Sequence, residues 1–164
     1  MADNKDFDVI WKAFNRPYDG VRPEIHIDVG RSSKRSELVS EILKTSKPEF
    51  KVNLLWGSGG GQKIDCSNYT KVQLTKFLGE GHYIVLKEFK GIKDFGMTIH
   101  KTGISLHFKP GKQWTIMVVL KFLNFLKKVL SKYSPVKVVI DEKGKFFTDK
   151  EIFQIYASIK DRAR

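Results

Sequence analysis

A chain of 164 residues, 41% of them hydrophobic, is long enough to bury a core and too apolar to be disordered throughout. Thirty Lys and Arg against eighteen Asp and Glu leave a formal net charge of +12, which favours a polyanionic partner, either nucleic acid or an anionic membrane. The single cysteine, Cys66, excludes an internal disulfide framework. No apolar run reaches the roughly 18 residues of a membrane span and no secretory signal is visible, so we expect an intracellular protein.

The first half of the chain predicts helices and strands in turn. Apolar residues spaced by three and four predict helices, and strict alternation of apolar and polar residues predicts strands. The expected elements are a helix over residues 6–15, a strand over Glu24–Val29, a helix that carries Leu38 to Leu43 and is capped by Ser33 or Ser36, and strands over Phe50–Trp56, at Ile64 and over Val72–Phe77. The glycine-rich segment Gly57–Gly61 is expected to be a flexible hairpin tip.

The second half of the chain continues with strands and then changes to helical spacing. The expected elements are strands over Tyr83–Phe89, Phe95–His100 and Ile104–Phe108, a long amphipathic helix over Lys112–Tyr133, a strand over Val136–Ile140 and a helix over residues 148–162. We therefore predict a single α+β domain over residues 1–164, in which a twisted antiparallel meander of roughly four to six strands packs against the long helix. Periodicity does not decide whether the two terminal helices belong to the core or are appendages.

The predicted strands offer an outer face that mixes cations with aromatic rings. In the stretch KTGISLHFKPGKQW, from Lys101 to Trp114, one alternation phase is apolar and the other is polar and basic. Proteins that bind single strands need this mixture, because cations neutralise phosphates and flat rings stack on bases. We expect the surplus cations to gather over this face and to bind nucleic acid, preferably single-stranded, with little sequence preference. The candidate binding residues are Lys51, Lys71, Gln73, Tyr83, Lys87, Phe89, Lys90, Lys101, His107 and Lys109.

Enzymatic alternatives rest on looser patterns. The segment GSGGGQKID lacks the Gly before the lysine and the Ser or Thr after it that a phosphate-binding loop requires. A magnesium-dependent nuclease needs an acidic residue on one strand and an acid-x-Lys pattern on another. Glu88 and Lys90 with Asp65 upstream meet this pattern, as do Asp141 and Lys143. The preferred interpretation is nevertheless a non-enzymatic binding protein, with no catalytic residue and no cofactor.

The four histidines show no close metal-ligand spacing, and we predict no metal site. His100 and His107 are placed to share a face of neighbouring strands. As an alternative function, the positive charge could bind anionic lipid headgroups in place of nucleic acid. The protein would then be a basic peripheral-membrane or matrix-like structural protein, such as a viral one. Exposed sheet edges and the apolar side of the long helix also make a homo-oligomer plausible.

Several short sequence segments between Lys87 and about Leu130, less than a third of the chain, match the strand-and-helix order of a known family. They are KEFKG, the strand FGMTIH, the pair Lys101 with GISL, and Gln113-Trp114 where the long helix opens. This stretch resembles the core of the transcriptional coactivator and Whirly group of single-stranded nucleic-acid-binding proteins. The resemblance implies a twisted four-stranded antiparallel sheet followed by a helix, with the unpaired strand held on the sheet and its hairpins. It also implies that phosphates approach Lys87, Lys90, Lys101 and Lys109 and that bases lie near Phe89 and His107.

Overall fold

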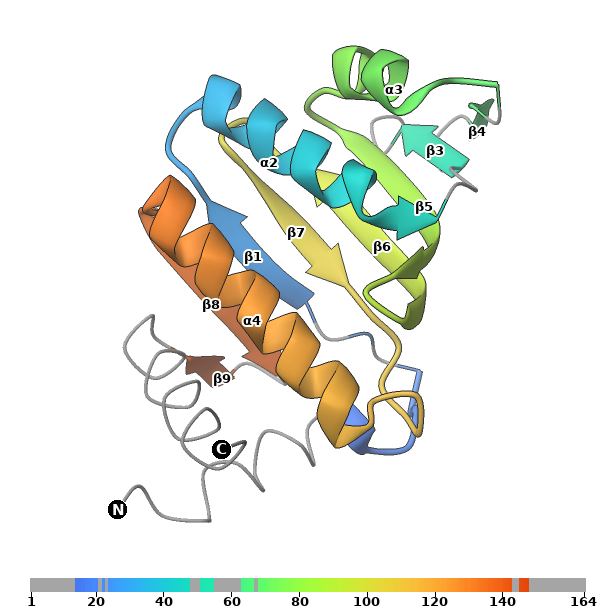
Figure 1. The fold of residues 1–164 in the computed structure, drawn as a ribbon, viewed down its shortest axis with the longest axis vertical. Helices are drawn as coiled ribbons and strands as arrows, with labels where there is room; N and C mark the ends of the chain where they lie inside the picture. The colour runs from blue at the N-terminus through green and yellow to red at the C-terminus, as the bar shows by residue number, and fades with distance from the viewer. Residues whose placement is uncertain are drawn as a thin grey trace.

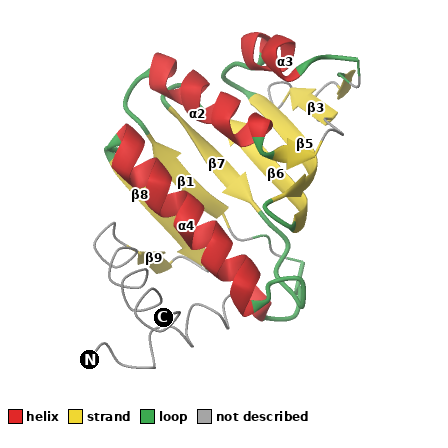
Figure 2. Cartoon of the chain, viewed as in Figure 1, coloured by secondary structure: helices red, strands yellow, loops and turns green. Residues whose placement is uncertain are grey.

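The computed structural model describes residues 14–20, 22, 24–47, 51–54, 63–66, 68–142 and 145–147. These residues form an α+β fold with one antiparallel sheet and three helices (Figure 1, Figure 2). Phe14 and Asn15 are helical, while the rest of the helix predicted over residues 6–15 lies outside the described residues. So do the predicted hairpin tip Gly57–Gly61 and the predicted helix over 148–162.

Nine strands make up the sheet in the described part of the chain. They are β1 (Glu24–Asp28), β2 (Ser46–Lys47), β3 (Lys51–Leu54), β4 (Lys63–Asp65), β5 (His82–Phe89), β6 (Ile92–Ile99), β7 (Gly103–His107), β8 (Lys137–Glu142) and β9 (Lys145–Phe147). Their order is β4-β3-β5-β6-β7-β1-β8-β9, β2 pairs with β5, and all pairings are antiparallel. The α+β class and the antiparallel sheet are confirmed. The predicted strand number was too low, because β1, β8 and β9 extend the β5-β6-β7 meander beyond β7.

Two helices, α2 (Ser32–Lys44) and α4 (Ile116–Tyr133), cross the same face of the sheet (Figure 1). The core elements follow each other as β1-α2-β6-β7-α4-β8, and their strands are arranged β8-β1-β7-β6. This is the split βαβ arrangement of ferredoxin-like folds, with β2 to β5 and α3 (Lys71–Phe77) inserted after α2. None of the described helices is long and apolar enough to cross a membrane.

Aromatic packing fills the space between the sheet and α4. Trp114 is fully buried and its ring lies 4.6 Å from that of Phe14 and 4.8 Å from that of Phe108. Its indole Nε1 donates to the carbonyl of Lys109 at 3.0 Å, so the buried polar atom is satisfied. Phe122 from α4 packs edge-on against Trp114 at 5.4 Å. The rings therefore anchor the start of α4 to the end of β7.

The helix predicted after Gly30 is confirmed, but its predicted cap is wrong. Its four buried residues are the expected Leu38, Val39, Ile42 and Leu43. The N-cap is Arg31, which makes no capping hydrogen bond through its side chain. Ser36 lies inside the helix and donates to the carbonyl of Ser32.

The strand predicted over Val72–Phe77 is instead the short helix α3. Thr70 accepts from the backbone N–H of Gln73, and the Gln73 side chain accepts from the backbone N–H of Thr70 at 2.8 Å. This capping box satisfies two N–H groups that would otherwise lack partners. Leu74 and Leu78, four residues apart, are buried together, while Val72 is 65% exposed. Helical spacing of the buried leucines and the cap therefore outweigh the alternation that predicted a strand.

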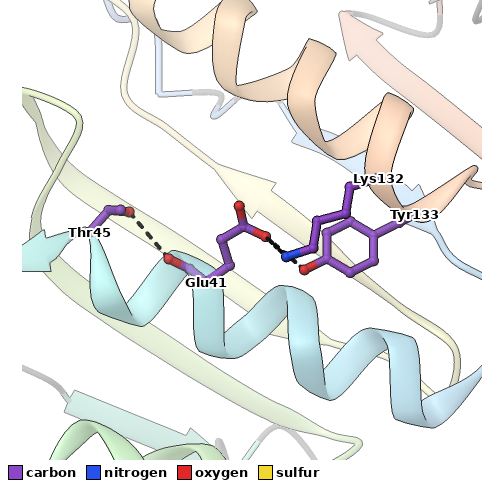
Figure 3. A network of polar contacts seen from close by, with 4 residues as sticks. All are labelled: Glu41, Thr45, Lys132 and Tyr133. Carbon is purple, nitrogen blue, oxygen red and sulfur yellow. Dashed lines mark hydrogen bonds and ion pairs between the residues drawn. The ribbon is translucent and has the colours of Figure 1, made fainter.

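A polar network joins α2 to α4 (Figure 3). The Tyr133 hydroxyl donates to Glu41 Oε2 at 2.7 Å, and Lys132 Nζ lies 3.2 Å from the same oxygen. The hydrogen bond from Tyr133 and the proximity of Lys132 hold the pKa of the Glu41 carboxyl below its usual range, against the opposing effect of burial. Burial, followed by the bond to Glu41, raises the pKa of Tyr133 to about 12. The network thus fixes the two helices side by side at one end of the covered face.

Candidate functional site on the open face of the sheet

The face of the sheet opposite α2 and α4 carries polar side chains that its strands bring into register. Tyr83 pairs with Thr98, Thr98 with Ser105, and Ser105 with His26, which makes one row across β5, β6, β7 and β1. Residues directly opposite each other in antiparallel strands share a face. No helix of the described chain covers this surface, which is here called the open face (Figure 1). The open face is therefore the place to look for a site.

Two histidines meet over a buried serine at the centre of the open face. His26 Nδ1 lies 3.0 Å from Ser105 Oγ, and His100 Nε2 lies 2.7 Å from the same oxygen. Ser105 is completely inaccessible to solvent, whereas both histidines are half-buried. The two imidazole rings are arranged edge to face with centroids 5.0 Å apart. One hydroxyl thus fixes the planes of two rings, one from β1 and one from the segment directly after β6.

His107 forms a second contact group beside the first. Its Nε2 lies 2.9 Å from Thr98 Oγ1, and its ring packs edge-on against Tyr83 at 5.7 Å. The hydroxyl end of the Tyr83 ring lies against Gly96, where a Cβ would overlap the tyrosine hydroxyl. Burial lowers the pKa of the His107 imidazole, Glu24 opposes this effect, and the nearby His100 and Arg22 lower the pKa further. Tyr83 and His107 therefore form a half-buried pair of flat rings in edge-to-face contact on the open face.

Three of the ten predicted binding residues belong to the open face. Tyr83 and His107 form the ring pair, and Lys87 is exposed on the same alternation phase of β5 as Tyr83. The structure confirms that His100 and His107 share a face, since both bond to side chains of the polar row. For Lys51, on β3, only the backbone is described.

Phe89 is a correction to the predicted surface. Its side chain is fully buried, with its ring 4.7 Å from Phe95 and 5.1 Å from Phe125 of α4. It therefore packs in the core and cannot stack on a base. Strict alternation from Tyr83 would place Phe89 on the open face. However, Lys87 and Asp94 do not pair in the β5–β6 ladder, and Asp94 has a positive φ of 55°. This irregularity shifts the phase of the alternation before Phe89.

Lys71 and Gln73 are also displaced from the predicted sheet face, because they belong to α3. Lys71 Nζ donates to the carbonyls of Lys44 and Ser46 at 3.2 and 3.1 Å, and so ties α3 to the end of α2. Gln73 completes the capping box described above. Both side chains have structural partners.

The last three predicted residues lie outside the strands. Lys90, with φ 53, forms the two-residue β5–β6 turn with Gly91, with φ 85, as a type I′ hairpin requires. Lys101 is exposed in the β6–β7 turn. Lys109 follows β7, and its Nζ lies 4.9 Å from the centre of the Tyr18 ring.

The prediction that the surplus cations gather over the sheet is wrong for the described residues, because many of them lie on the helices. A depression of about 300 Å³ on the helical side is lined by Glu41, Thr45, Lys90, Lys121, Asn124, Phe125 and Lys128.

Sequence reasoning also missed Arg22, which is exposed and donates to the carbonyl of Asp94 at 3.1 Å. Arg22 lies close enough to His107 to lower the pKa of its imidazole. No periodic signal marks Arg22, since it precedes β1 in an irregular segment.

The pairing of the strands separates the residues of one predicted nuclease pattern and brings an acidic residue of the other beside Glu24. Asp65 pairs with Lys51, and Lys51 pairs with Val85, so Asp65 lies two strands away from β5 and three residues off the level of Glu88. At about 4.8 Å per strand and 3.3 Å per residue, the two Cα atoms are roughly 14 Å apart, too far to share one magnesium ion. Asp141, by contrast, pairs directly with Glu24 across β8 and β1. Lys143 lies outside the described residues.

The described residues define an α+β protein whose helices α2 and α4 lie on one face of an antiparallel sheet and leave the open face to polar side chains. Comparison of the chain with protein-family models, with curated proteins and with solved structures found no significant match.

Proposed function

We propose that the protein binds single-stranded nucleic acid on the open face, without catalysing a reaction on it. The observation that carries this proposal is the half-buried Tyr83–His107 ring pair on the face of the sheet that the described helices leave open, in a chain of net charge +12. Stacking on such rings tolerates any base, because every base offers a flat face, and is worth about 1–3 kcal/mol per base. Four-stranded sheets of RNA-recognition domains bind unpaired bases in the same manner.

The exposed cations beside the rings supply the contacts to phosphate. Arg22 lies close to His107, and Lys87 extends from β5 two alternations beyond Tyr83. Because cations neutralise phosphates regardless of sequence, affinity is dominated by the backbone and falls with salt. The open face offers hydrogen-bonding groups, but most are already paired with each other, which limits readout of base identity.

Fluorescence anisotropy with a labelled single-stranded oligonucleotide and with its duplex, at several salt concentrations, tests the proposal. The double variant Arg22→Gln, Lys87→Gln should bind more weakly, and the slope of log affinity against log salt should fall by roughly 1.4, about 0.7 for each lost phosphate contact. The matched control Lys44→Gln, Lys76→Gln removes the same charge from α2 and α3 and should leave the slope nearly unchanged. Tyr83→Leu should weaken binding by about 1–3 kcal/mol with no change of slope.

Other outcomes would redirect or overturn the proposal. Equal losses in the two double variants would mean that only total charge matters. A loss confined to Lys121→Gln, Lys128→Gln would move the binding surface to the depression between α2 and α4. Binding to anionic vesicles but to no oligonucleotide would establish a membrane partner, and cleavage of the strand when magnesium is added would establish a nuclease.

A further inference from the structure

Three potential metal ligands converge on the open face next to the ring pair. Glu24 and His26 come from β1, and His100 follows the end of β6. One ligand atom from each residue lies within 4.8 Å of the other two. In a tetrahedral site with ligand bonds of about 2.0–2.1 Å, neighbouring ligand atoms are roughly 3.4 Å apart. Small side-chain rotations would therefore bring the three atoms into a single coordination sphere.

The chemistry of these ligands selects a class of ion. Two imidazoles and one carboxylate suit divalent first-row transition metals, zinc in particular, and leave positions open for water or a further ligand. Magnesium and calcium instead favour sites made entirely of oxygen. All three side chains are half-buried, so they are partly desolvated yet still reachable from solvent.

A second and independent observation is the way in which Ser105 holds both imidazoles. Its fully buried Oγ contacts one nitrogen of His26 and one of His100. In metal centres, hydrogen bonds of this kind fix the orientation of the ligating rings before the ion arrives. The Ser105 hydroxyl, buried between His26 of β1 and His100 after β6, also has no role in the aromatic core, which lies on the other side of the sheet.

We propose that Glu24, His26 and His100 bind one divalent transition-metal ion, with Ser105 as the positioning residue for both imidazoles. The proposal does not depend on nucleic-acid binding. Zinc titration of the untagged 164-residue chain, followed by calorimetry, should give one saturable site. Titration with Co²⁺ should give visible absorption bands of a site with nitrogen and oxygen ligands.

Variants of the three ligands and one matched histidine test the assignment. Glu24→Gln, His26→Gln and His100→Gln should each weaken zinc binding by at least about tenfold. The control His82→Gln should bind like the parent, because His82 is half-buried outside the cluster and its Nδ1 accepts from the N–H of Gly79. Ser105→Ala keeps all three ligands and should weaken zinc binding by about 10–100-fold, with altered Co²⁺ bands.

Folding and binding are separated by recording the metal-free melting temperature of every variant. Should His26→Gln fail to fold, Glu24→Gln and imidazole NMR signals of the parent protein still decide the matter, since zinc should shift the signals of His26 and His100 but not those of His82. The proposal is overturned if zinc does not saturate a single site, if His82→Gln loses as much affinity as His26→Gln, or if Glu24→Gln binds zinc like the parent.

Discussion

The hydrogen bond from Tyr133 to Glu41 should contribute measurably to stability (Figure 3). Tyr133→Phe removes this bond together with the contact between the hydroxyl and Lys132. A hydrogen bond to a charged group contributes about 1.5–3 kcal/mol. The Glu41 side chain is 34% exposed and keeps its contact with Lys132, so water can replace part of the lost bond. We therefore expect Tyr133→Phe to lower the free energy of unfolding by roughly 1–1.5 kcal/mol at neutral pH.

The pH dependence of this effect has a definite sign. The pKa of Glu41 is depressed in the folded protein, chiefly by the Tyr133 hydroxyl, so its stabilisation is present above the unfolded pKa and is lost as the pH falls through the folded one. The pKa of Tyr133 is raised to about 12, so its stabilisation is complete below the ordinary value of 10.0 and is lost as the pH rises toward 12. The penalty of Tyr133→Phe should therefore be largest between these limits.

Urea denaturation at neutral pH and at a series of decreasing acidic pH values measures the penalty and its pH dependence. As the pH falls through the depressed pKa of Glu41, the carboxyl takes up a proton and keeps only a neutral hydrogen bond, so the penalty should shrink to at most about 1 kcal/mol. Tyr18→Phe is the matched control, because Tyr18 is 42% exposed and its hydroxyl lies 3.3 Å from the carbonyl of Gly20. It should cost less than about 0.5 kcal/mol. Equal penalties for the two variants, or a penalty independent of pH, would refute the reasoning.

Three further substitutions probe the fold and the open face. Phe89→Ala should lower the free energy of unfolding by about 3–5 kcal/mol in urea denaturation, because the ring is buried against Phe95 and Phe125. A loss of oligonucleotide affinity at unchanged stability would instead mean that the Phe89 ring lies on the surface. Gly96→Ala should displace the Tyr83 ring, which is visible as a change in the tyrosine NMR signals, and should weaken oligonucleotide binding as Tyr83→Leu does. Thr70→Ala should cost about 1 kcal/mol by removing the cap of α3, whereas a neutral effect would mean that the capping box does not support that helix.

Local patterns predicted those elements whose apolar residues follow one periodicity without interruption. The alternation of Ile25 and Ile27 and the helical spacing of Leu38 to Leu43 are examples, and both sets are buried as expected. The segment Val72–Phe77 fits either period, and the deciding signal was the capping pair Thr70 and Gln73, which can be read in the sequence. The position of Phe89 could not be predicted, because the break in alternation depends on the positive φ of a non-glycine residue.

The candidate metal site could not be predicted from the spacing of residues. His26 and Ser105 are 79 positions apart, and they meet only because β1 joins the sheet next to β7. Strand order is a property of the whole fold, set by how α2 and α4 cross the sheet, and no local period encodes it. Ring pairing on the open face was partly predictable, because Tyr83 and His107 lie on polar phases of two strands that were recognised.

The two proposals place a divalent metal ion and a negatively charged nucleic acid on the same open face of the sheet. Because the two ligands would then influence each other's affinity, both proposals can be tested in one experiment. Glu24 pairs with His107 across β1 and β7, and Arg22 lies close to His107, so an ion at Glu24 would lie roughly 10 Å from a phosphate held by Arg22. The two positive charges of the ion at that distance in water attract one phosphate by about 0.8 kcal/mol, and screening at 0.1 M salt reduces this attraction to roughly 0.3 kcal/mol, about 1.7-fold in affinity. Zinc should therefore tighten oligonucleotide binding slightly for each nearby phosphate, and the oligonucleotide should tighten zinc binding by the same factor. The coupling should disappear in Glu24→Gln. Tighter binding with zinc that persists in this variant would mean that the ion acts elsewhere on the chain.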